Sequence, residues 1–282
     1  MLNDLVLHER TRMLAEKLIS NLPHALIIDG PVGTGVLALA KALSHSTGSP
    51  EMILQPKKSQ NGQMVVDEKE GSIIIEDIRQ LYEQTRTRQP QTHVYILDTG
   101  ERSMTIAAQN AFLKLLEEPR PNLHFIITTH QFDQLLPTIR SRSQRLALLP
   151  VSSEQTMDII SGLNISDATT RTRLAFVGRG RPALIKRLAA DKTAYDARVQ
   201  IMSDAKTMIG GTKYEKLVIA HKYRDNRANA VTLLDDINHQ LRTLIQTRPD
   251  QALVRDIATH LETRQKILSG GNIRLQLAAD MV

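Results

Sequence analysis

The sequence predicts an α/β protein, in which a parallel sheet with helices on both faces is followed by an entirely helical C-terminal part. Up to Leu149, short apolar segments alternate with helical segments, as is typical of a parallel sheet. From Pro150 to Val282 the apolar spacing is helical throughout. Aromatic residues make up only 3% of the chain, so we expect a core of mainly aliphatic side chains.

The strands of the sheet are predicted from short apolar runs, the first of which leads into a glycine-rich turn. These runs are residues 24–29, 93–98, 125–129 and 145–149. Two further apolar runs, residues 64–66 and 73–75, flank the polar stretch DEKEG. We expect these two runs to pair as a hairpin or a pair of strands.

Helices are predicted where apolar residues recur with helical spacing, over residues 4–20, 36–43, 76–88, 106–118 and 131–142. Ser103 or Thr105 is expected to cap the fourth of these, and Pro119 to end it. Beyond Pro150, glycine and proline residues separate further helices at 178–182, 210–211, 249 and 270–271. We therefore expect an α/β domain at 1–149, a small helical domain at 150–194 and a helical bundle at 195–282.

The composition excludes several classes of protein. The chain of 282 residues contains no cysteine, which excludes a disulfide framework and a cysteine-ligated zinc site. No apolar run approaches the roughly 18 residues that a membrane helix needs. Charged residues come too early in the N-terminal segment for a signal peptide. We therefore expect a soluble protein of the cytoplasm, with no metal site.

The net charge of +6 is unevenly distributed along the chain. Residues 1–149 carry 16 basic and 16 acidic side chains, whereas residues 150–282 carry 20 and 14. Between Thr169 and Ala190 there are six basic residues and no acidic one. Such a cluster can face nucleic-acid phosphates or an acidic partner. For each residue, a solvated helical face is at least as good an interpretation.

The stretch from Ala25 to Leu43 has the order of a phosphate-binding loop, with a buried strand, a glycine-rich turn and a helix. The turn contains Gly30, Gly33, Thr34 and Gly35. The phosphate-loop pattern requires a lysine at position 36 and a serine or threonine at position 37. This chain has Val36 and Leu37, which can neither neutralise phosphate oxygens nor ligate magnesium. The spacing therefore predicts a tight turn without ATP hydrolysis, although its backbone N–H groups could hold an anion weakly.

Several blocks of the sequence together resemble the clamp-loader branch of the AAA+ superfamily. In chain order they are LPHALIIDGP at 22–31, VYILD at 94–98, AQNAFLKLLEEP at 108–119, FIITT at 125–129, LPTIRSRSQ at 136–144 and GNIRL at 271–275. The resemblance covers nearly the whole chain and is greatest to the delta-prime type of subunit in bacterial DNA polymerase III. It implies an AAA+ P-loop-type sheet domain, a helical lid domain and an all-α collar domain that oligomerises.

The resemblance also implies a vestigial nucleotide site. Active members carry Asp-Glu at the end of the second strand, where this chain has Asp98 and Thr99. Asp98 is then interpreted as a vestigial acid with a local hydrogen bond, and the glycines and Thr34 as a vestigial P-loop. Thr128, Thr129 and the segment 178–184, with Arg179 and Arg181, lie in regions where active members sense the nucleotide. No cofactor is expected to bind in cis.

The tripeptide Ser141, Arg142, Ser143 resembles the Ser-Arg-Cys motif of the family, whose arginine reaches into the ATP site of the neighbouring subunit. A guanidinium is planar and permanently charged, which suits the phosphoryl oxygens of a transition state. The resemblance therefore assigns Arg142, with Ser141, as an arginine finger that acts in trans. The alternative interpretation is a cation at the end of a helix, facing its dipole.

Taken together, the resemblance implies a non-catalytic stator subunit of a clamp loader. Its implied partners are gamma/tau-type ATPase subunits that bind ATP and Mg²⁺, the delta subunit, the sliding clamp and primed DNA. DNA would be contacted at phosphates, with Arg86 and Arg88 as candidates; no membrane partner is implied. The alternatives are an active gamma/tau-type ATPase and an AAA+ protein of DNA recombination or repair.

Overall fold

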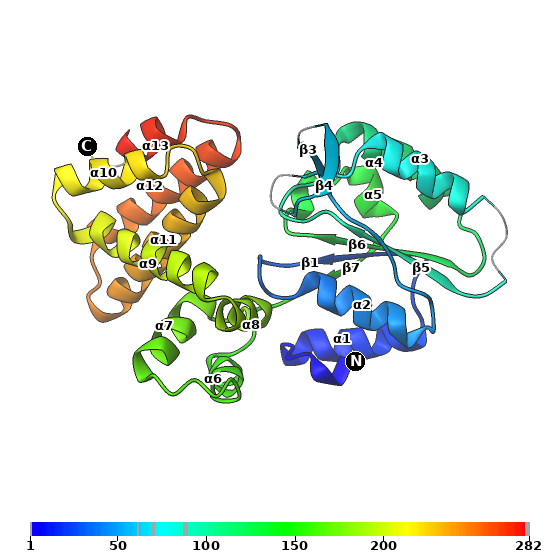
Figure 1. The fold of residues 1–282 in the computed structure, drawn as a ribbon, viewed down its shortest axis with the longest axis horizontal. Helices are drawn as coiled ribbons and strands as arrows, with labels where there is room; N and C mark the ends of the chain where they lie inside the picture. The colour runs from blue at the N-terminus through cyan, green and yellow to red at the C-terminus, as the bar shows by residue number, and fades with distance from the viewer. Residues whose placement is uncertain (1, 61, 69–70, 87–89, 280–282) are drawn as a thin grey trace. The chain divides into compact units, whose positions relative to one another are not determined.

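A computed structural model describes residues 2–60, 62–68, 71–86 and 90–279 (Figure 1). The chain forms two compact units, Met1–Ala189 and Ala190–Val282. The first unit contains a parallel sheet and its helices, and the second unit is helical. The predicted α/β class with a helical C-terminal part is therefore confirmed.

The sheet has five strands in the order β2-β5-β6-β1-β7, and every neighbouring pair in it is parallel. All five residues of β1 are buried, because strands in the middle of a parallel sheet are covered on both faces. The strands are β1 (Ala25–Asp29), β2 (Met52–Leu54), β5 (His93–Asp98), β6 (Leu123–Thr129) and β7 (Gln144–Ala147). The edge strand β2 lies in a part of the chain for which no strand was predicted.

Alternate residues of β1 point into two different cores, as the two-residue period of a strand requires. Leu26 and Ile28 pack with Leu39 in the core below the sheet in Figure 1. Ile27 packs with Phe112 in the core on the other face. The first core is covered by α1 (Glu9–Ser20) and α2 (Val36–Ser46), and the second by α3 (Ile75–Gln84), α4 (Ile106–Glu117) and α5 (Pro137–Ser141). Two short 3-10 helices, η1 (Leu2–Asp4) and η2 (Phe132–Gln134), complete this part.

The predicted pairing of residues 64–66 with residues 73–75 is wrong. The strand β4 (Gln63–Val66) pairs instead with β3 (Lys57–Gln60), in an antiparallel hairpin separate from the main sheet. The sequence KKSQ of β3 carries no strand signal because the hairpin is largely exposed. Ile73 is fully buried in the core, and Asp77 accepts a hydrogen bond from the N–H of Ile74 at 3.0 Å. The run 73–75 therefore leads into α3 rather than forming a strand.

Three predicted helices have different bounds in the structure. The helix predicted over 131–142 is divided into η2 and α5, because Pro137 has no N–H to continue an earlier helix and instead occupies the first turn of α5. The helix predicted from residue 4 begins at Glu9, and α3 ends at Gln84 rather than at residue 88. Thr105, one of the two candidate caps, accepts a hydrogen bond from Ala108 N–H and caps α4.

From Pro150 to Ala279 the regular structure is helical. The first unit contains α6 (Ser153–Ser161), α7 (Ala168–Gly178) and most of α8 (Pro182–Ala190). The second unit contains α9 (Lys192–Gly210), α10 (Lys213–Lys222), α11 (Arg227–Thr247), α12 (Gln251–Leu268) and α13 (Ile273–Ala279). The predicted division into three domains stays a prediction. Among the described residues, no helix is long and apolar enough to cross a membrane.

A buried ion pair joins α9 to α11 inside the second unit. Arg198 and Asp236 make two hydrogen bonds, one of them 2.6 Å long between Nη2 and Oδ1, and the side chains are 9% and 1% exposed. The adjacent Asp235 also pairs with an arginine, Arg264 at 2.7 Å, but its side chain is 52% exposed. The two neighbouring aspartates therefore make the same kind of contact in very different surroundings.

We predict that Asp236→Ala destabilises the helical unit by about 3–5 kcal/mol, because Arg198 is left as a buried, unpaired charge. The matched control is Asp235→Ala, which removes an exposed ion pair and should cost less than about 1 kcal/mol. Urea denaturation of the full chain, followed by circular dichroism, measures both changes. Equal losses in the two variants would contradict this account of the pair.

Candidate functional site

The glycine-rich turn has the predicted geometry between β1 and α2. Gly33 and Gly35 have φ angles of 89° and 99°, values that favour glycine, and Gly35 is the N-cap of α2. Thr34 is 3% exposed, and its hydroxyl donates to the carbonyl oxygen of Pro31 at 2.8 Å. The hydroxyl of Thr34 is thus used to close the turn.

The two residues that replace the phosphate-binding side chains face the core. Val36 is 4% exposed and belongs to the core cluster that includes Leu39, and Leu37 packs against the same cluster. Neither side chain offers a polar group to a phosphate. Their contribution at these positions is the packing of α2 against the sheet.

The first turn of α8 lies directly against the glycine-rich turn. The N–H of Leu184 donates to the carbonyl oxygen of Gly33 at 3.0 Å. A Cβ atom placed on Gly33 would lie only 2.7 Å from the Cβ of Leu184, and one placed on Gly35 would lie 3.7 Å from that of Ala183. Gly33 is therefore required for its backbone conformation and also for the close approach of α8.

Asp98 and Thr128 bind each other at the carboxyl ends of adjacent strands. The hydroxyl of Thr128 donates to Oδ1 of Asp98 at 2.7 Å, and the N–H of Gly100 donates to the same oxygen at 3.3 Å. Thr99 is fully buried, and its hydroxyl donates to the carbonyl oxygen of Thr128 at 3.0 Å. These polar groups satisfy one another inside the protein.

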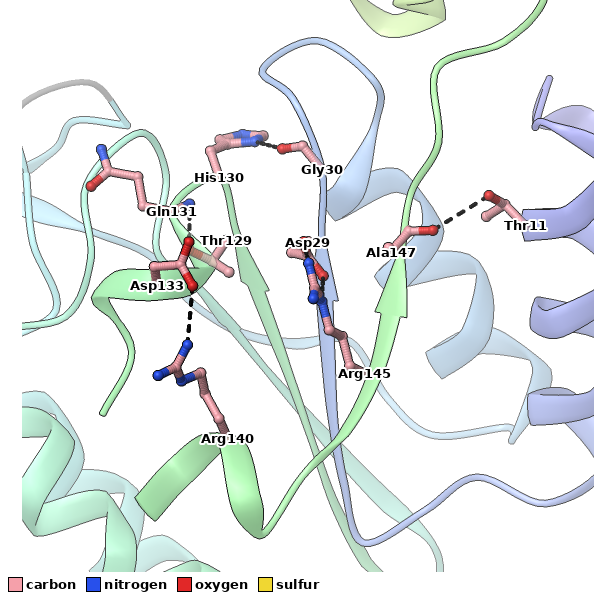
Figure 2. Close-up of polar contacts among 10 residues, drawn as sticks. All are labelled: Thr11, Asp29, Gly30, Thr129, His130, Gln131, Asp133, Arg140, Arg145 and Ala147. Atoms are coloured by element: carbon pink, nitrogen blue, oxygen red, sulfur yellow. Dashed lines mark hydrogen bonds and ion pairs between the residues drawn. The ribbon is translucent and has the colours of Figure 1, made fainter. Parts of the chain in front are cut away.

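The structure thus brings the glycine-rich turn, Asp98 and Thr128 to the same edge of the sheet, where β1, β5 and β6 end. His130 joins them, since its Nδ1 lies 2.7 Å from the carbonyl oxygen of Gly30 (Figure 2). Among the described residues, no group of three His, Cys, Asp or Glu side chains is placed to hold a metal ion.

Arg142 and Ser141 lie at the opposite edge of the sheet from the glycine-rich turn. Arg142 lies between α5 and β7. The first residue of β7, Gln144, pairs with Leu26 near the start of β1, so this segment lies where β1 begins. Its Nη2 lies 3.0 Å from Oε1 of Glu117, and its Nη1 donates to the carbonyl oxygen of Thr138 at 3.3 Å. The Ser141 hydroxyl donates to the same carbonyl oxygen. Arg142 therefore cannot act on a ligand held by the glycine-rich turn of its own chain.

Two neighbours of Arg142 in the sequence make contacts that sequence reasoning missed (Figure 2). Arg145 donates two hydrogen bonds of 2.8 and 2.7 Å to the carboxylate of Asp29, and its guanidinium lies 3.8 Å from the ring centre of Phe132. These hydrogen bonds raise the pKa of Arg145. Arg140 pairs with Asp133 at 3.0 Å, and its guanidinium lies 5.3 Å from the same ring centre. The sequence offered little sign of the contact between β1 and β7, only an acid at the end of one strand, Asp29, and an arginine in another, Arg145.

Gln109 is a further residue that sequence reasoning did not identify. It is fully buried in α4, and its amide nitrogen donates to the carbonyl oxygens of Met104 and Gln134 at 3.1 and 3.2 Å. Its amide oxygen accepts from the N–H of Leu136 at 2.7 Å. Gln109 therefore ties α4 to the segment that leads into α5, and so positions Arg142.

The remaining basic candidates have local contacts. Arg86, just beyond the end of α3, lies 3.7 Å from Glu83, and both side chains are exposed. Arg88 lies outside the described residues. Arg179 and Arg181 donate to the carbonyl oxygens of Phe176 and Val177 in the last turn of α7. Their sensing and DNA-binding roles stay predictions.

The model of the protein family described as "DNA polymerase III, delta subunit" matches residues 8–152 of this chain, about half of its length. The chain belongs to this family. It is thus a member of the clamp-loader AAA+ proteins, as the sequence blocks indicated.

Similar proteins agree with this family. A probable replication factor C subunit 5 of Caenorhabditis elegans is 25% identical over 273 residues, which are 92% of this chain and 72% of that protein. The DNA polymerase III subunit delta' of Haemophilus influenzae is 40% identical over 70 residues, 25% of this chain and 21% of that protein. The solved structure of a DNA polymerase III gamma-subunit-related protein of Thermotoga maritima has the same fold, with a TM-score of 0.51, 19% identity and 97% of both chains covered.

We predict that Gln109→Ala destabilises the sheet-containing unit by about 3 kcal/mol, because the N–H of Leu136 and two carbonyl oxygens lose their partner. The matched control is Asn110→Ala, which removes an exposed amide at the next position of the same helix and should change stability by less than about 0.5 kcal/mol. Urea denaturation of the full chain measures both. A loss below about 1 kcal/mol for Gln109→Ala would show that the segment before α5 holds its position without the amide.

Proposed function

We propose that this chain is a non-catalytic, delta-prime-like stator subunit of a clamp loader in DNA replication. The observation that carries the proposal is the separation of two features within one sheet. The glycine-rich turn, with Val36 and Leu37, lies at the carboxyl edge of the strands, and Arg142 lies at the amino edge. An arginine so placed can serve the ATP of another subunit, and not a ligand of its own chain.

Four features support the absence of ATP hydrolysis in this chain. Val36 and Leu37 pack into the core, and Thr99 replaces the glutamate that polarises water in active members. Asp98, the acid that would organise magnesium, already binds Thr128 and Gly100. The first turn of α8 also occupies the space against Gly33. We infer that ATP and Mg²⁺ are bound by neighbouring subunits and not by this one.

The arginine finger is supported by the exposure and chemistry of Arg142. Its side chain is 40% exposed and is held at the surface by an exposed carboxylate. A guanidinium can bind phosphoryl oxygens with two parallel hydrogen bonds. The neighbour would be a gamma/tau-type ATPase subunit, in an assembly that also contains the delta subunit. That assembly would load the sliding clamp on primed DNA, with protein–DNA contacts mainly to phosphates.

The isolated chain is predicted to neither bind nor hydrolyse ATP, because the side chains that would hold the phosphates and the metal ion are missing. Thermal unfolding with and without Mg-ATP tests binding, since a ligand of the native state raises Tm. A concentration of about 1 mM also detects weak binding, with a Kd of roughly 1 mM. Phosphate release tests hydrolysis, with a gamma/tau-type subunit from the same source as the positive control. Clear turnover that Asp98→Ala abolishes would favour the motor-ATPase alternative instead.

In the reconstituted complex, Arg142→Ala should leave assembly intact and lower turnover at the neighbouring ATP site by about 10³-fold or more. The measurement uses complexes in which the other ATP sites have been inactivated, with DNA present. Arg140→Ala is the matched control, since it removes another arginine of the same segment that pairs with Asp133, and it should retain most of the activity. Unchanged turnover with Arg142→Ala would rule out the finger. Tight DNA binding without assembly would favour a role in recombination or repair.

A further inference from the structure

We propose that Glu117 is a positioning residue that holds Arg142 in a resting position and releases it to the nucleotide of the neighbouring subunit. This inference rests on the proposed role of Arg142 in trans. In this proposal the carboxylate of Glu117 competes with the phosphate oxygens of the neighbour's ATP for the guanidinium of Arg142, and the two bind it in turn.

The contact itself spans two elements. Nη2 of Arg142, after α5, lies 3.0 Å from Oε1 of Glu117, the last residue of α4. The two side chains are 40% and 51% exposed. An exposed ion pair of this kind contributes little to stability, so it can set the direction of the side chain and still be broken by a stronger anion.

Because Glu117 lies at the C-terminal end of α4, a cation beside it is favourable. The carbonyl groups at the end of α4 give that end of the helix a partial negative charge, and a carboxylate there is unfavourable. Glu118 follows as the C-cap, so two acids stand together at the negative end of the helix dipole. The guanidinium of Arg142 offsets this charge. When the arginine leaves, the charge is exposed again, and the arginine is drawn back once the phosphates are gone.

The three arginines near the start of β7 differ in how firmly they are held. Arg145 makes two hydrogen bonds to Asp29, whose side chain is only 12% exposed, and stacks on Phe132. Removing Arg145 from this site would leave a nearly buried carboxylate unpaired, which is costly. Arg140 is 31% exposed and also lies against Phe132. Among the described residues, the side chain of Arg142 makes polar contacts only with Glu117 and the carbonyl oxygen of Thr138.

A phosphate group is a better partner for the released arginine than Glu117. The triphosphate of ATP carries several negative charges, and a carboxylate carries one. At a subunit interface from which water is excluded, the attraction between unlike charges is also stronger than at an exposed surface. Glu117 should therefore hold Arg142 in the absence of the neighbour's nucleotide and lose it when ATP is in place.

The test uses Glu117→Gln, which keeps the size of the side chain and removes its charge. In the reconstituted complex with one active ATP site, we expect kcat/KM at that site to rise about two- to fivefold, because breaking the resting ion pair no longer opposes the reaction. Glu118→Gln is the matched control and should leave kcat/KM unchanged. The double variant Glu117→Gln/Arg142→Ala should be as inactive as Arg142→Ala alone.

The outcomes separate this proposal from the proposed function. If Arg142→Ala abolishes turnover but Glu117→Gln leaves kcat/KM unchanged or lowers it, the finger stands and the resting contact with Glu117 is refuted. If Arg142→Ala is silent, the finger is refuted and the role of Glu117 falls with it. Side-chain NMR of the isolated full chain gives a second readout: the guanidinium of Arg142 should rotate and exchange its protons faster in Glu117→Gln than in Glu118→Gln. Equal rates in these two variants would also overturn the proposal.

Discussion

The direction of the five parallel strands decides where every polar group of this domain can act. In a parallel sheet all carboxyl ends lie at one edge, so the segments after β1, β5 and β6 meet there although they are far apart in the sequence. The segment before β7 must lie at the other edge, and it carries Arg142. One chain therefore presents the glycine-rich turn on one side and the cation of Arg142 on the other, as the proposed action of Arg142 on a second subunit requires.

The carboxyl edge has kept its geometry because its polar groups bind one another. In the absence of a phosphate or a metal ion, a buried carboxylate and buried hydroxyls would be costly unless they were paired. Asp98 is paired with Thr128, Thr34 with its own turn, and the carbonyl oxygen of Gly33 with the N–H of Leu184. The same backbone is thus stabilised by internal hydrogen bonds and by the apolar side chains of Val36 and Leu37.

The sequence allowed four of the five strands of the sheet and the glycine-rich turn to be predicted, because buried parallel strands are continuous apolar runs and a tight turn needs glycine at fixed positions. The β3–β4 hairpin could not be predicted in the same way, since it is exposed and the strand KKSQ has no apolar pattern. Pairs such as Asp29 with Arg145, or Glu117 with Arg142, depend on which strands and helices become neighbours. Each member alone looks like an ordinary surface charge.

The segment from Arg140 to Arg145 shows that the contacts of an arginine, more than its charge or its own exposure, distinguish a side chain that stabilises the fold from one that is available to a partner. The three side chains are 31%, 40% and 50% exposed for Arg140, Arg142 and Arg145. All three guanidinium groups have a carboxylate within hydrogen-bond distance. Arg145 donates hydrogen bonds from both Nε and Nη2 to the nearly buried carboxylate of Asp29, and this ion pair joins β7 to β1. Arg142 rests on an exposed acid at the end of α4, while Gln109 fixes the segment from which it projects. A firm backbone and a loosely held side chain are together what a group that acts on another subunit requires, because the position is determined by the fold and only the last contact has to change.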